Sequence, residues 1–412
     1  PLLVQPFAAS ATQVDEKLID NRYIVVLKST PATAIQPVTR SLNDLLQALP
    51  LSGVQITHEY DSALLGFAAT MPEHVAKALS QHRLVDYIEQ DRQLSLHTTQ
   101  NNATWGLDRL DERTASYDMQ YSYQTEGEGV HAYILDSGLN AQHRDFTGRV
   151  GNGFDATGGS GGGLLGGGGL FGGGGGLFGG GLFGPAPEPE PEPENDPFDS
   201  STNPDDCNGH GTHVAGTVGG TEFGVAKKVT LHAVRVVNCL GVGNGSDTIA
   251  GIEWVVENHV APAVINLSLG GSGFQALDDA IASAYRQGIV SVAAAGNDST
   301  DACNSSPARE PSAITVAATD RNDSRASYSN IGPCVDIFAP GSNIESADYR
   351  SNTGVAVLSG TSMAAPHVAG AVAKLLSEGV APADLEVELS NRASQGVLTD
   401  TRNTVNEMLF SN

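Results

Sequence analysis

The chain has 412 residues, enough for two or three folding units at about 150 residues each. Apolar residues make up 40% of it and charged residues 17%, which excludes disorder throughout, although 49 glycines require a glycine-rich segment somewhere. Lys and Arg number 22 against 47 Asp and Glu, and the net charge of −25 would repel a polyanion, which excludes nucleic-acid binding as the main function. Such an excess of carboxylates suits hard cations such as calcium.

The four cysteines fall into two spaced pairs in one half of the chain, with no Cys-x-x-Cys motif among them. Zinc-ribbon and thioredoxin-like sites therefore lose their main support. The spacing fits two loops that are each closed by a disulfide in an oxidising compartment. The chain starts at Pro1, without a basic segment followed by an apolar one, so we expect a secreted protein whose signal peptide has been removed. The cysteines are Cys207, Cys239, Cys303 and Cys334.

The N-terminal part predicts a leader and a small α+β domain. Residues 1–19 carry no hydrophobic period and are interpreted as a loose leader. Residues 20–97 follow the order strand, helix, strand, strand, helix, strand, which is the split βαβ order of a ferredoxin-like unit. We therefore expect an independent ferredoxin-like domain here. Its elements are expected at residues 23–27, 41–49, 54–60, 64–69, 72–81 and 85–89.

Beyond Trp105 the pattern changes to apolar strands separated by helices. The strands are continuously apolar rather than alternating, which is typical of strands buried on both faces. The sequence therefore predicts an α/β domain over residues 98–412, with a parallel sheet covered by helices and ligands bound beyond the carboxyl ends of the strands. We expect strands at residues 130–135, 229–237, 263–269 and 289–295, and helices at 246–258 and 275–286.

One segment, at about residues 160–205, interrupts this domain. Residues 158–184 are mostly Gly with Leu and Phe and contain three Gly-Leu-Phe-Gly copies, and alternating Pro and Glu follow over residues 185–194. An uncharged stretch of this length raises the alternative of a membrane span, but each interior Gly costs a helix about 1 kcal/mol relative to Ala. We therefore expect a flexible insertion and no transmembrane span.

Two short motifs place candidate catalytic residues beside glycines. Asp136 follows an apolar run and precedes a Ser-Gly turn, where Asp is more often a turn or cap residue than a catalyst. His210 lies between two glycines at the expected start of a helix, where a substrate backbone could approach the imidazole. His210 and His213 could instead be metal ligands, but the His-Glu-x-x-His pattern of zinc proteases is absent.

A third motif places Ser362 at an expected helix N-terminus. Pro is tolerated in the first turn of a helix, so we expect Pro366 to lie in that turn and to fix where the helix starts. A Ser in this position is ordinarily a helix cap. A nucleophilic Ser needs a base that takes its proton and a carboxylate that orients the base, and His210 and Asp136 are residues of these types.

The chain order Asp136, His210, Ser362 is the order of the subtilisin triad, and each residue stands among small neighbours. On these motifs residues 105–412, apart from the insertion, resemble subtilisin-like serine proteases of the proteinase K branch, and they are most similar to aqualysin-like bacterial enzymes. Residues 20–97 resemble the inhibitory propeptide of such enzymes. This second resemblance includes the sequences LGFAA at residues 65–69 and VDYIE at residues 85–89.

The resemblance implies the roles of the catalytic residues. Ser362 would be the nucleophile, His210 the general base and then acid, and Asp136 the carboxylate that orients the imidazole. Asn297 and the backbone N–H of Ser362 would stabilise the oxyanion, which is worth about 3 to 4 kcal/mol of barrier. The resemblance also implies two disulfides, which pair Cys207 with Cys239 and Cys303 with Cys334.

Two further segments match the substrate-pairing strands of the family. The resemblance implies that an extended peptide pairs between them and that specificity is broad, with a preference for apolar or aromatic side chains. The implied substrate-binding residues are Gly241, Gly243, Asn244, Gly245, Ser268, Leu269, Gly270, Gly271, Ala294 and Gly296.

Calcium is the metal that the resemblance implies. Asp336 matches a calcium carboxylate of the family whose partners are backbone carbonyls, here those of Pro311 and Ala313. A second, N-terminal site is found in some aqualysin-like enzymes. In a chain this acidic, the matching cluster is equally well explained as a solvated face. The residues of this second site would be Asp108, Asp111 and Glu112.

The leading hypothesis is a secreted, calcium-stabilised serine endopeptidase, made as a self-processing zymogen. It would act as a monomer on protein and peptide substrates, with its own propeptide as inhibitor. The alternative is a catalytically idle protease scaffold that serves in binding or surface attachment through the Gly-Leu-Phe-Gly insertion. An idle scaffold has no physical need for a complete catalytic set, which favours the enzyme.

Overall fold

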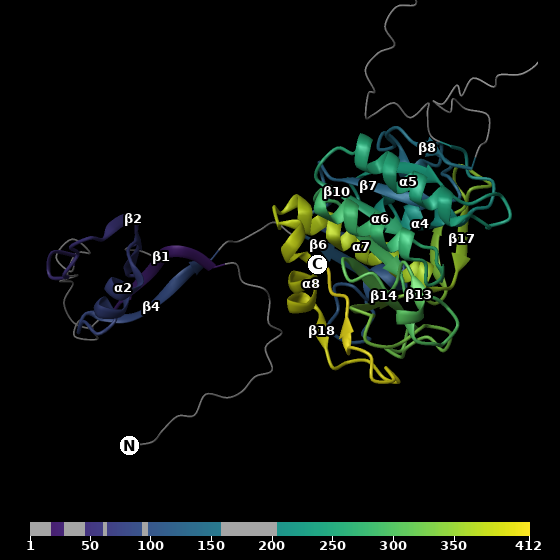
Figure 1. Ribbon diagram of the computed structural model, residues 1–412. Coiled ribbons are helices and arrows are strands. Elements are labelled where there is room, and N and C mark those ends of the chain that lie inside the picture. The colour runs from purple at the N-terminus through teal and green to yellow at the C-terminus, as the bar shows by residue number, and fades with distance from the viewer. Residues whose placement is uncertain (1–17, 29–45, 61–63, 93–97, 158–203) are drawn as a thin grey trace, which may run out of the picture. The chain divides into compact units, whose positions relative to one another are not determined.

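The computed structural model describes residues 18–28, 46–60, 64–92, 98–157 and 204–412 (Figure 1). The expected leader before residue 18, most of the helix expected at 41–49, and residues 158–203 of the insertion lie outside the described residues. The chain divides into two compact units, Pro1–Leu96 and His97–Asn412. In the part of the chain that the structure describes, no helix has the length and apolar character needed to cross a membrane.

The first unit is an antiparallel sheet with a helix packed on one face. Tyr23, Val25 and Leu27 alternate along one strand and are buried in a cluster with Phe67 and with Leu79 of the helix. The strand order β2-β3-β1-β4 is that of a ferredoxin-like unit, which confirms the expected fold. The elements are β1 (Leu18–Leu27), β2 (Gln55–Tyr60), β3 (Gly66–Thr70), α2 (Glu73–Leu79) and β4 (Val85–Arg92).

The second unit is built on a nine-stranded sheet with the order β18-β19-β15-β14-β12-β10-β7-β9-β8. All neighbouring strands are parallel except β18 and β19. Every residue of the four central strands β14, β12, β10 and β7 is buried, which explains their continuously apolar sequences. The strands are β7 (His131–Asp136), β8 (Phe154–Asp155), β9 (Thr230–Arg235), β10 (Ala263–Leu267), β12 (Val290–Ala294), β14 (Ala313–Thr319), β15 (Ile337–Pro340), β18 (Ser394–Gln395) and β19 (Glu407–Met408).

Helices cover both faces of this sheet (Figure 1). Along β7, Ile134 packs in a cluster with residues of α4 and α7, whereas Tyr133 and Leu135 pack in a second cluster with residues of α5 and α6. Because neighbouring strand residues point to opposite faces, the two helix pairs lie on opposite sides. This confirms the predicted α/β class. The helices are α3 (Trp105–Asp108), α4 (His210–Gly219), α5 (Gly245–Asn258), α6 (Gln275–Arg286), α7 (Thr361–Ser377) and α8 (Leu385–Arg392).

Three small two-stranded sheets complete the second unit. One of them pairs Thr98 with Tyr123 and so includes the first described residue of this unit. Another places Gly271 opposite Ser306 beside the expected substrate segment. The pairs are β5 (Thr98–Asn101) with β6 (Gln120–Tyr123), β11 (Gly271–Ser272) with β13 (Ser305–Ser306), and β16 (Ile344–Ala347) with β17 (Val355–Leu358).

Candidate active site

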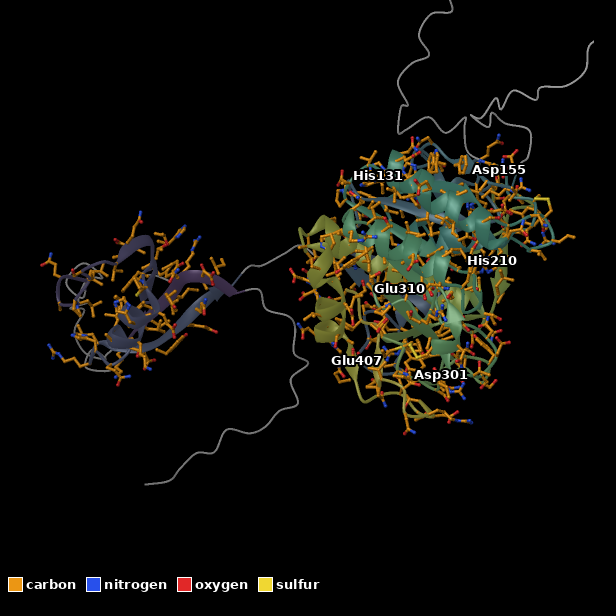
Figure 2. The ribbon with its side chains drawn as sticks, viewed as in Figure 1. His131, Asp155, His210, Asp301, Glu310 and Glu407 are labelled. Carbon is orange, nitrogen blue, oxygen red and sulfur yellow. A yellow bond between two sulfur atoms is a disulfide. The ribbon has the colours of Figure 1, made fainter. Side chains whose placement is uncertain are left out.

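A carboxylate and an imidazole meet where the end of β7 contacts the start of α4. Asp136 is the last residue of β7 and is 1% exposed. Nδ1 of His210, the first residue of α4, lies 2.9 Å from both Oδ1 and Oδ2 of Asp136 (His210 is labelled in Figure 2). Because a carboxylate can only accept, Nδ1 carries the proton and Nε2 is left as the basic nitrogen.

The surroundings of His210 favour its protonated form. Burial is the largest single influence and lowers the pKa of His210. The negative charge and hydrogen bond of Asp136, together with the charge of Asp206, more than offset burial and raise the pKa above its ordinary value. An imidazole stabilised in this way can take a proton from a neighbouring hydroxyl and hold it.

Ser362 is the second residue of α7 and is bound to the segment after β10. Its Oγ donates to the carbonyl oxygen of Ser268 at 3.0 Å. In return, Oγ of Ser268 donates to the carbonyl oxygen of Ser362 at 2.9 Å. The amide nitrogen of buried Asn266 donates to the same Ser268 hydroxyl at 2.8 Å.

The expectation that Pro366 lies in the first turn of the helix is wrong. The helix begins at Thr361, so Pro366 is its sixth residue and lies inside it. In a helix the N–H of residue 366 would bond to the carbonyl of Ser362, but Pro has no N–H. The hydroxyl of Ser268 fills that place. The helix therefore tolerates the interior Pro because the unpaired carbonyl has a partner outside it.

Asn297 is oriented by the residue before Ser362. The N–H and the hydroxyl of Thr361 both donate to Oδ1 of Asn297, at 2.8 and 3.0 Å. The NH₂ group of this amide is thereby left as the donor, and Asn297 lines the same hollow as Ser362. Gly296 has φ of +103°, and a Cβ at this position would lie 2.4 Å from Nδ2 of Asn330, so Gly is required for the turn that presents Asn297.

Three adjoining hollows lie along the site, and all ten expected substrate-binding residues line them. The largest, of about 440 Å³, adjoins Ser362 and Asn297 and includes Ala294 and Gly296. Two others, of about 240 Å³ each, extend past His210 toward α5. Leu269 and Gly270 border all three. The remaining expected residues in the two smaller hollows are Gly241, Gly243, Asn244, Gly245, Ser268 and Gly271.

Several residues of the site were not among those predicted from the sequence. Asp206, Ser137 and Thr361 orient its functional groups, and Phe274 lines one hollow. Asp206 stands four residues before His210. An Asp that satisfies the N–H groups of a helix start has no sequence pattern that distinguishes it from an Asp in an ordinary turn. The helix α5 begins at Gly245, one residue before its expected start.

Both disulfides implied by the resemblance are present. Cys207–Cys239 joins the loop before His210 to the segment containing Gly241. Nδ2 of Asn208 also donates to the carbonyl oxygen of Cys239 at 3.1 Å. The second disulfide, Cys303–Cys334, closes a loop in the C-terminal half of the unit.

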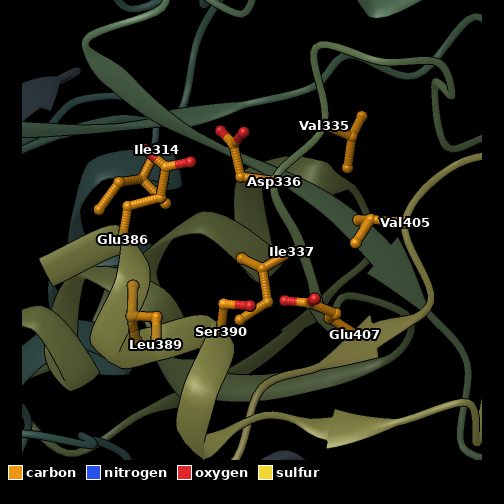
Figure 3. Close-up of a pocket in the computed structure, with 9 residues that line it drawn as sticks. All are labelled: Ile314, Val335, Asp336, Ile337, Glu386, Leu389, Ser390, Val405 and Glu407. Carbon is orange, nitrogen blue, oxygen red and sulfur yellow. The ribbon is translucent and has the colours of Figure 1, made fainter.

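Asp336 lines a hollow of about 210 Å³ together with two further carboxylates, Glu386 and Glu407 (Figure 3). Its Oδ2 accepts from the N–H of Thr315 at 2.7 Å. The pKa of Asp336 is raised to about 7, chiefly by burial and also by the charges of the two glutamates, whereas the hydrogen bond from Thr315 opposes the rise. Pro311 and Ala313, the other expected calcium ligands, are not among the residues that line this hollow.

At the N-terminal cluster, Asp108 accepts from the N–H groups of Asp118 and Met119, at 3.3 and 2.9 Å. Oδ2 of Asp111 accepts from Ser122 at 2.6 Å, whereas its Oδ1 is buried without a partner. Burial raises the pKa of Asp111 to about 6 and also raises that of Glu112. Among the described residues, no three His, Cys, Asp or Glu side chains are arranged to hold a metal ion.

A serine at a helix start, a basic imidazole and a buried carboxylate at the end of a parallel strand define a serine hydrolase of the subtilisin type. The chain belongs to the subtilase family. The model described as "Subtilase family" matches residues 127–411, and that described as "Peptidase inhibitor I9" matches residues 22–97. The protein is therefore a subtilisin-like serine protease with an inhibitory propeptide domain, which confirms the resemblance.

Known relatives agree. The extracellular serine proteinase of Thermus sp. (strain Rt41A) is 45% identical over 373 residues, covering 87% of this chain and 80% of the relative. Alkaline serine exoprotease A of Vibrio alginolyticus is 41% identical, covering 96% of this chain and 68% of the relative. The crystal structure of a cold adapted subtilisin-like serine proteinase has a TM-score of 0.63 at 44% identity, covering 76% of this chain and 99% of that one. The extracellular relative confirms the expected secretion.

Proposed function

We propose that the protein is a monomeric serine endopeptidase, made as a self-processing zymogen, with Asp136, His210 and Ser362 as its triad. One observation carries the proposal: Nδ1 of His210 is held 2.9 Å from both oxygens of a buried Asp136, which leaves Nε2 as the basic nitrogen of a ring that lines a hollow. If Asp136 and His210 served only to stabilise the fold, the basic nitrogen of His210 would not need to lie beside a hollow.

The reaction follows from these groups. In the resting structure the hydroxyl of Ser362 donates to the carbonyl oxygen of Ser268, and this bond must break before the reaction. Oγ of Ser362 then attacks the carbonyl carbon of the scissile bond while Nε2 of His210 takes its proton, and the resulting imidazolium is stabilised by Asp136. The amide of Asn297 and the N–H of Ser362 donate to the oxyanion. His210 then gives its proton to the leaving amine. Water repeats the sequence on the acyl-enzyme, which releases the acid and restores Ser362.

The hollows support binding of an extended peptide with broad specificity. The largest adjoins Ser362 and is bordered mainly by small residues, so it can accept a bulky apolar or aromatic side chain. Gly270 and Gly271 leave the neighbouring backbone open for pairing, since a Cβ on Gly271 would meet nothing within 4 Å.

We propose that residues 20–97 form the inhibitory propeptide and that residues 98–412 form the catalytic domain. Thr98 is the first residue of β5, which pairs with β6 inside the second unit, so cleavage at the His97–Thr98 bond would leave that pairing intact. Residues 93–97, proposed to occupy the cleft as product, lie outside the described residues.

Calcium is proposed as a structural ion. The unpartnered, buried Oδ1 of Asp111 and the raised pKa of both Asp111 and Asp336 fit carboxylates that a hard cation would stabilise. Asp111, with Asp108 and Glu112, would hold one ion. Asp336, with the carbonyl oxygens of Pro311 and Ala313, would hold another. Bound calcium would neutralise these charges and contribute to stability.

Hydrolysis of denatured casein tests the proposal against the idle-scaffold alternative. Ser362→Ala should abolish hydrolysis and leave the chain unprocessed, whereas Ser377→Ala, at the other end of α7, should hydrolyse casein normally and yield a form that starts near Thr98 on N-terminal sequencing. Casein hydrolysis by Ser362→Ala would contradict the proposed nucleophile. An active form that starts beyond Trp105 would contradict the proposed boundary.

A further inference from the structure

The loop before α4 contains a carboxylate that the proposed mechanism does not use. Oδ1 of Asp206 accepts from Oγ of Ser137 at 2.9 Å and from the N–H groups of Asn208 and Gly209 at 2.9 and 2.8 Å. Its Oδ2 accepts from the N–H and the hydroxyl of Thr212 at 2.9 and 2.6 Å. Both oxygens are therefore saturated by donors from two separate elements, the end of β7 and the start of α4.

These bonds fasten the first turn of α4. The N-cap residue of this helix is Gly209, which has no side chain to cap it. The N–H of Gly211 instead donates to Oγ of Ser137 at 3.0 Å, and the N–H of Thr212 donates to Asp206. The Asp206–Ser137 pair thus satisfies N–H groups that a helix start otherwise leaves free. His210 is the first residue of this turn, so the Asp206–Ser137 pair fixes the position of the His210 backbone from which the imidazole extends.

The same pair is tied to Asp136. The N–H of Ser137 donates to Oδ1 of Asp136 at 2.8 Å, so the residue that bonds Asp206 also orients the buried carboxylate. The strand end and the helix start are in direct contact, since a Cβ on Gly211 would lie 2.3 Å from the carbonyl oxygen of Gly138. A small displacement of the loop at Asp206 would therefore move His210 relative to Asp136.

We propose that Asp206 is a positioning residue for the catalytic pair: it locks the start of α4 to the end of β7, so that Nδ1 of His210 stays on both oxygens of Asp136, and its charge stabilises the imidazolium that forms during the reaction. This inference rests on the proposed function of Asp136, His210 and Ser362. It assigns Asp206 no contact with substrate.

The charged and titratable groups around His210 determine its pKa, so the effect of Asp206 can be measured from the pH dependence of activity. Asp136 faces the imidazole from β7, Asp206 faces it from the loop, and His213 faces it from the same helix. Burial lowers the pKa of His213 to about 4, so this side chain stays neutral where His210 titrates. Loss of the Asp206 charge should therefore lower the pKa of His210 and move the acid limb of activity to lower pH.

The test compares Asp206→Asn with Asp205→Asn, a matched change at the exposed neighbouring carboxylate. Both are measured as mature enzyme, normalised by active-site titration, on a peptide p-nitroanilide with Phe before the scissile bond. Asp206→Asn should lower kcat on the order of tenfold or more, because small misplacements of catalytic groups are costly. KM should stay within about twofold, because Asp206 lies outside the substrate hollows. The midpoint of the acid limb of kcat/KM should fall, whereas Asp205→Asn should match the wild type.

Ser137→Ala distinguishes the positioning effect of Asp206 from the effect of its charge. It removes the hydrogen bond that joins Asp206 to the end of β7, and it keeps the Asp206 carboxylate. It should lower kcat without moving the acid midpoint. The proposal is overturned if Asp206→Asn behaves like Asp205→Asn, or if its kcat falls while the acid midpoint stays in place. If Asp206→Asn does not mature, Ser137→Ala decides, and an unchanged kcat overturns the proposal. Activity retained by Ser362→Ala, measured in parallel, would instead overturn the triad itself.

Discussion

Ser268 and Ser362 exchange hydrogen bonds: the hydroxyl of each donates to the carbonyl oxygen of the other, at 2.9 and 3.0 Å. The first bond exists because Pro366 leaves the carbonyl of Ser362 without its helical partner. In the second bond, the hydroxyl proton of Ser362 is donated to a backbone carbonyl in the segment after β10. The position of Ser362 therefore depends on Ser268 as well as on α7.

Replacing Ser268 should affect both stability and turnover. Ser268→Ala would remove the hydrogen-bond partner of the buried Asn266 amide and of the partly buried Ser362 carbonyl. We expect a loss of about 1 to 3 kcal/mol of unfolding free energy, measured by urea unfolding in a Ser362→Ala background that prevents autolysis. In the active background, kcat should fall by roughly tenfold. Ser377→Ala is the control, and equal stability of the two variants would contradict the role given to Ser268.

A buried imidazole pair should make the enzyme sensitive to acid. Nδ1 of His131 lies 2.8 Å from Nε2 of His232, whose ring stacks on Tyr133 at 4.4 Å. Burial lowers the pKa of His232 to about 4. Between this pKa and its ordinary value near 6.5, only the unfolded chain binds the proton, so stability falls as pH falls, by up to about 1.4 kcal/mol per pH unit for this residue.

Urea unfolding of Ser362→Ala between pH 7.5 and 5, with and without His232→Gln, measures this dependence. The additional substitution should reduce the slope of unfolding free energy against pH by about one proton. His259→Gln, the same substitution at a partly exposed position, is the control. An identical slope for His232→Gln would show that this imidazole is not neutral in the folded protein.

Calcium should stabilise the protein through its carboxylates. An ion that binds only the folded state adds about 2.7 kcal/mol at one hundred times its Kd, so chelation should lower the Tm first and activity only as a consequence. Asp111→Asn should reduce the calcium-dependent rise in Tm, and without calcium it should be neutral or stabilising because it removes a buried charge. Asp279→Asn, on the exposed side of α6, should respond to calcium like the wild type. Equal calcium responses of the two variants would exclude Asp111 as a ligand.

The insertion should be dispensable for peptide hydrolysis. The carbonyl oxygen of Pro204 accepts from the N–H of Leu139 at 3.0 Å, so a deletion should end before this residue. Removal of residues 160–203 should leave kcat/KM on a small peptide within a few-fold, since closing a loop of different length costs little. If the Leu-Phe pairs promote adhesion, the deletion should also reduce binding to phosphatidylcholine vesicles. Unchanged binding would contradict the attachment hypothesis.

The fold was largely predictable because its signals are local. The continuous apolar runs of β7 and β10 and the period of α6 all lie within two residues of their expected bounds. The supports of the site were not predictable in the same way. The bonds of Asp206 and the interior position of Pro366 depend on partners far away in the chain, and sequence patterns do not contain that information. Asn297 was recognised only through resemblance, because an Asn after a strand otherwise predicts a turn.

The site at which a serine-directed sulfonyl fluoride reacts tests the proposed nucleophile directly. After inactivation of the mature enzyme, mass spectrometry of its peptides should locate one sulfonyl group on Ser362, and residual activity should fall in proportion to the labelled fraction, reaching zero at one group per chain. The His210→Ala variant, which lacks the base, should remain unprocessed and should not be labelled at Ser362. Full inactivation with Ser362 unmodified, or immediate loss of activity in chelator at low temperature, would contradict the proposed serine mechanism.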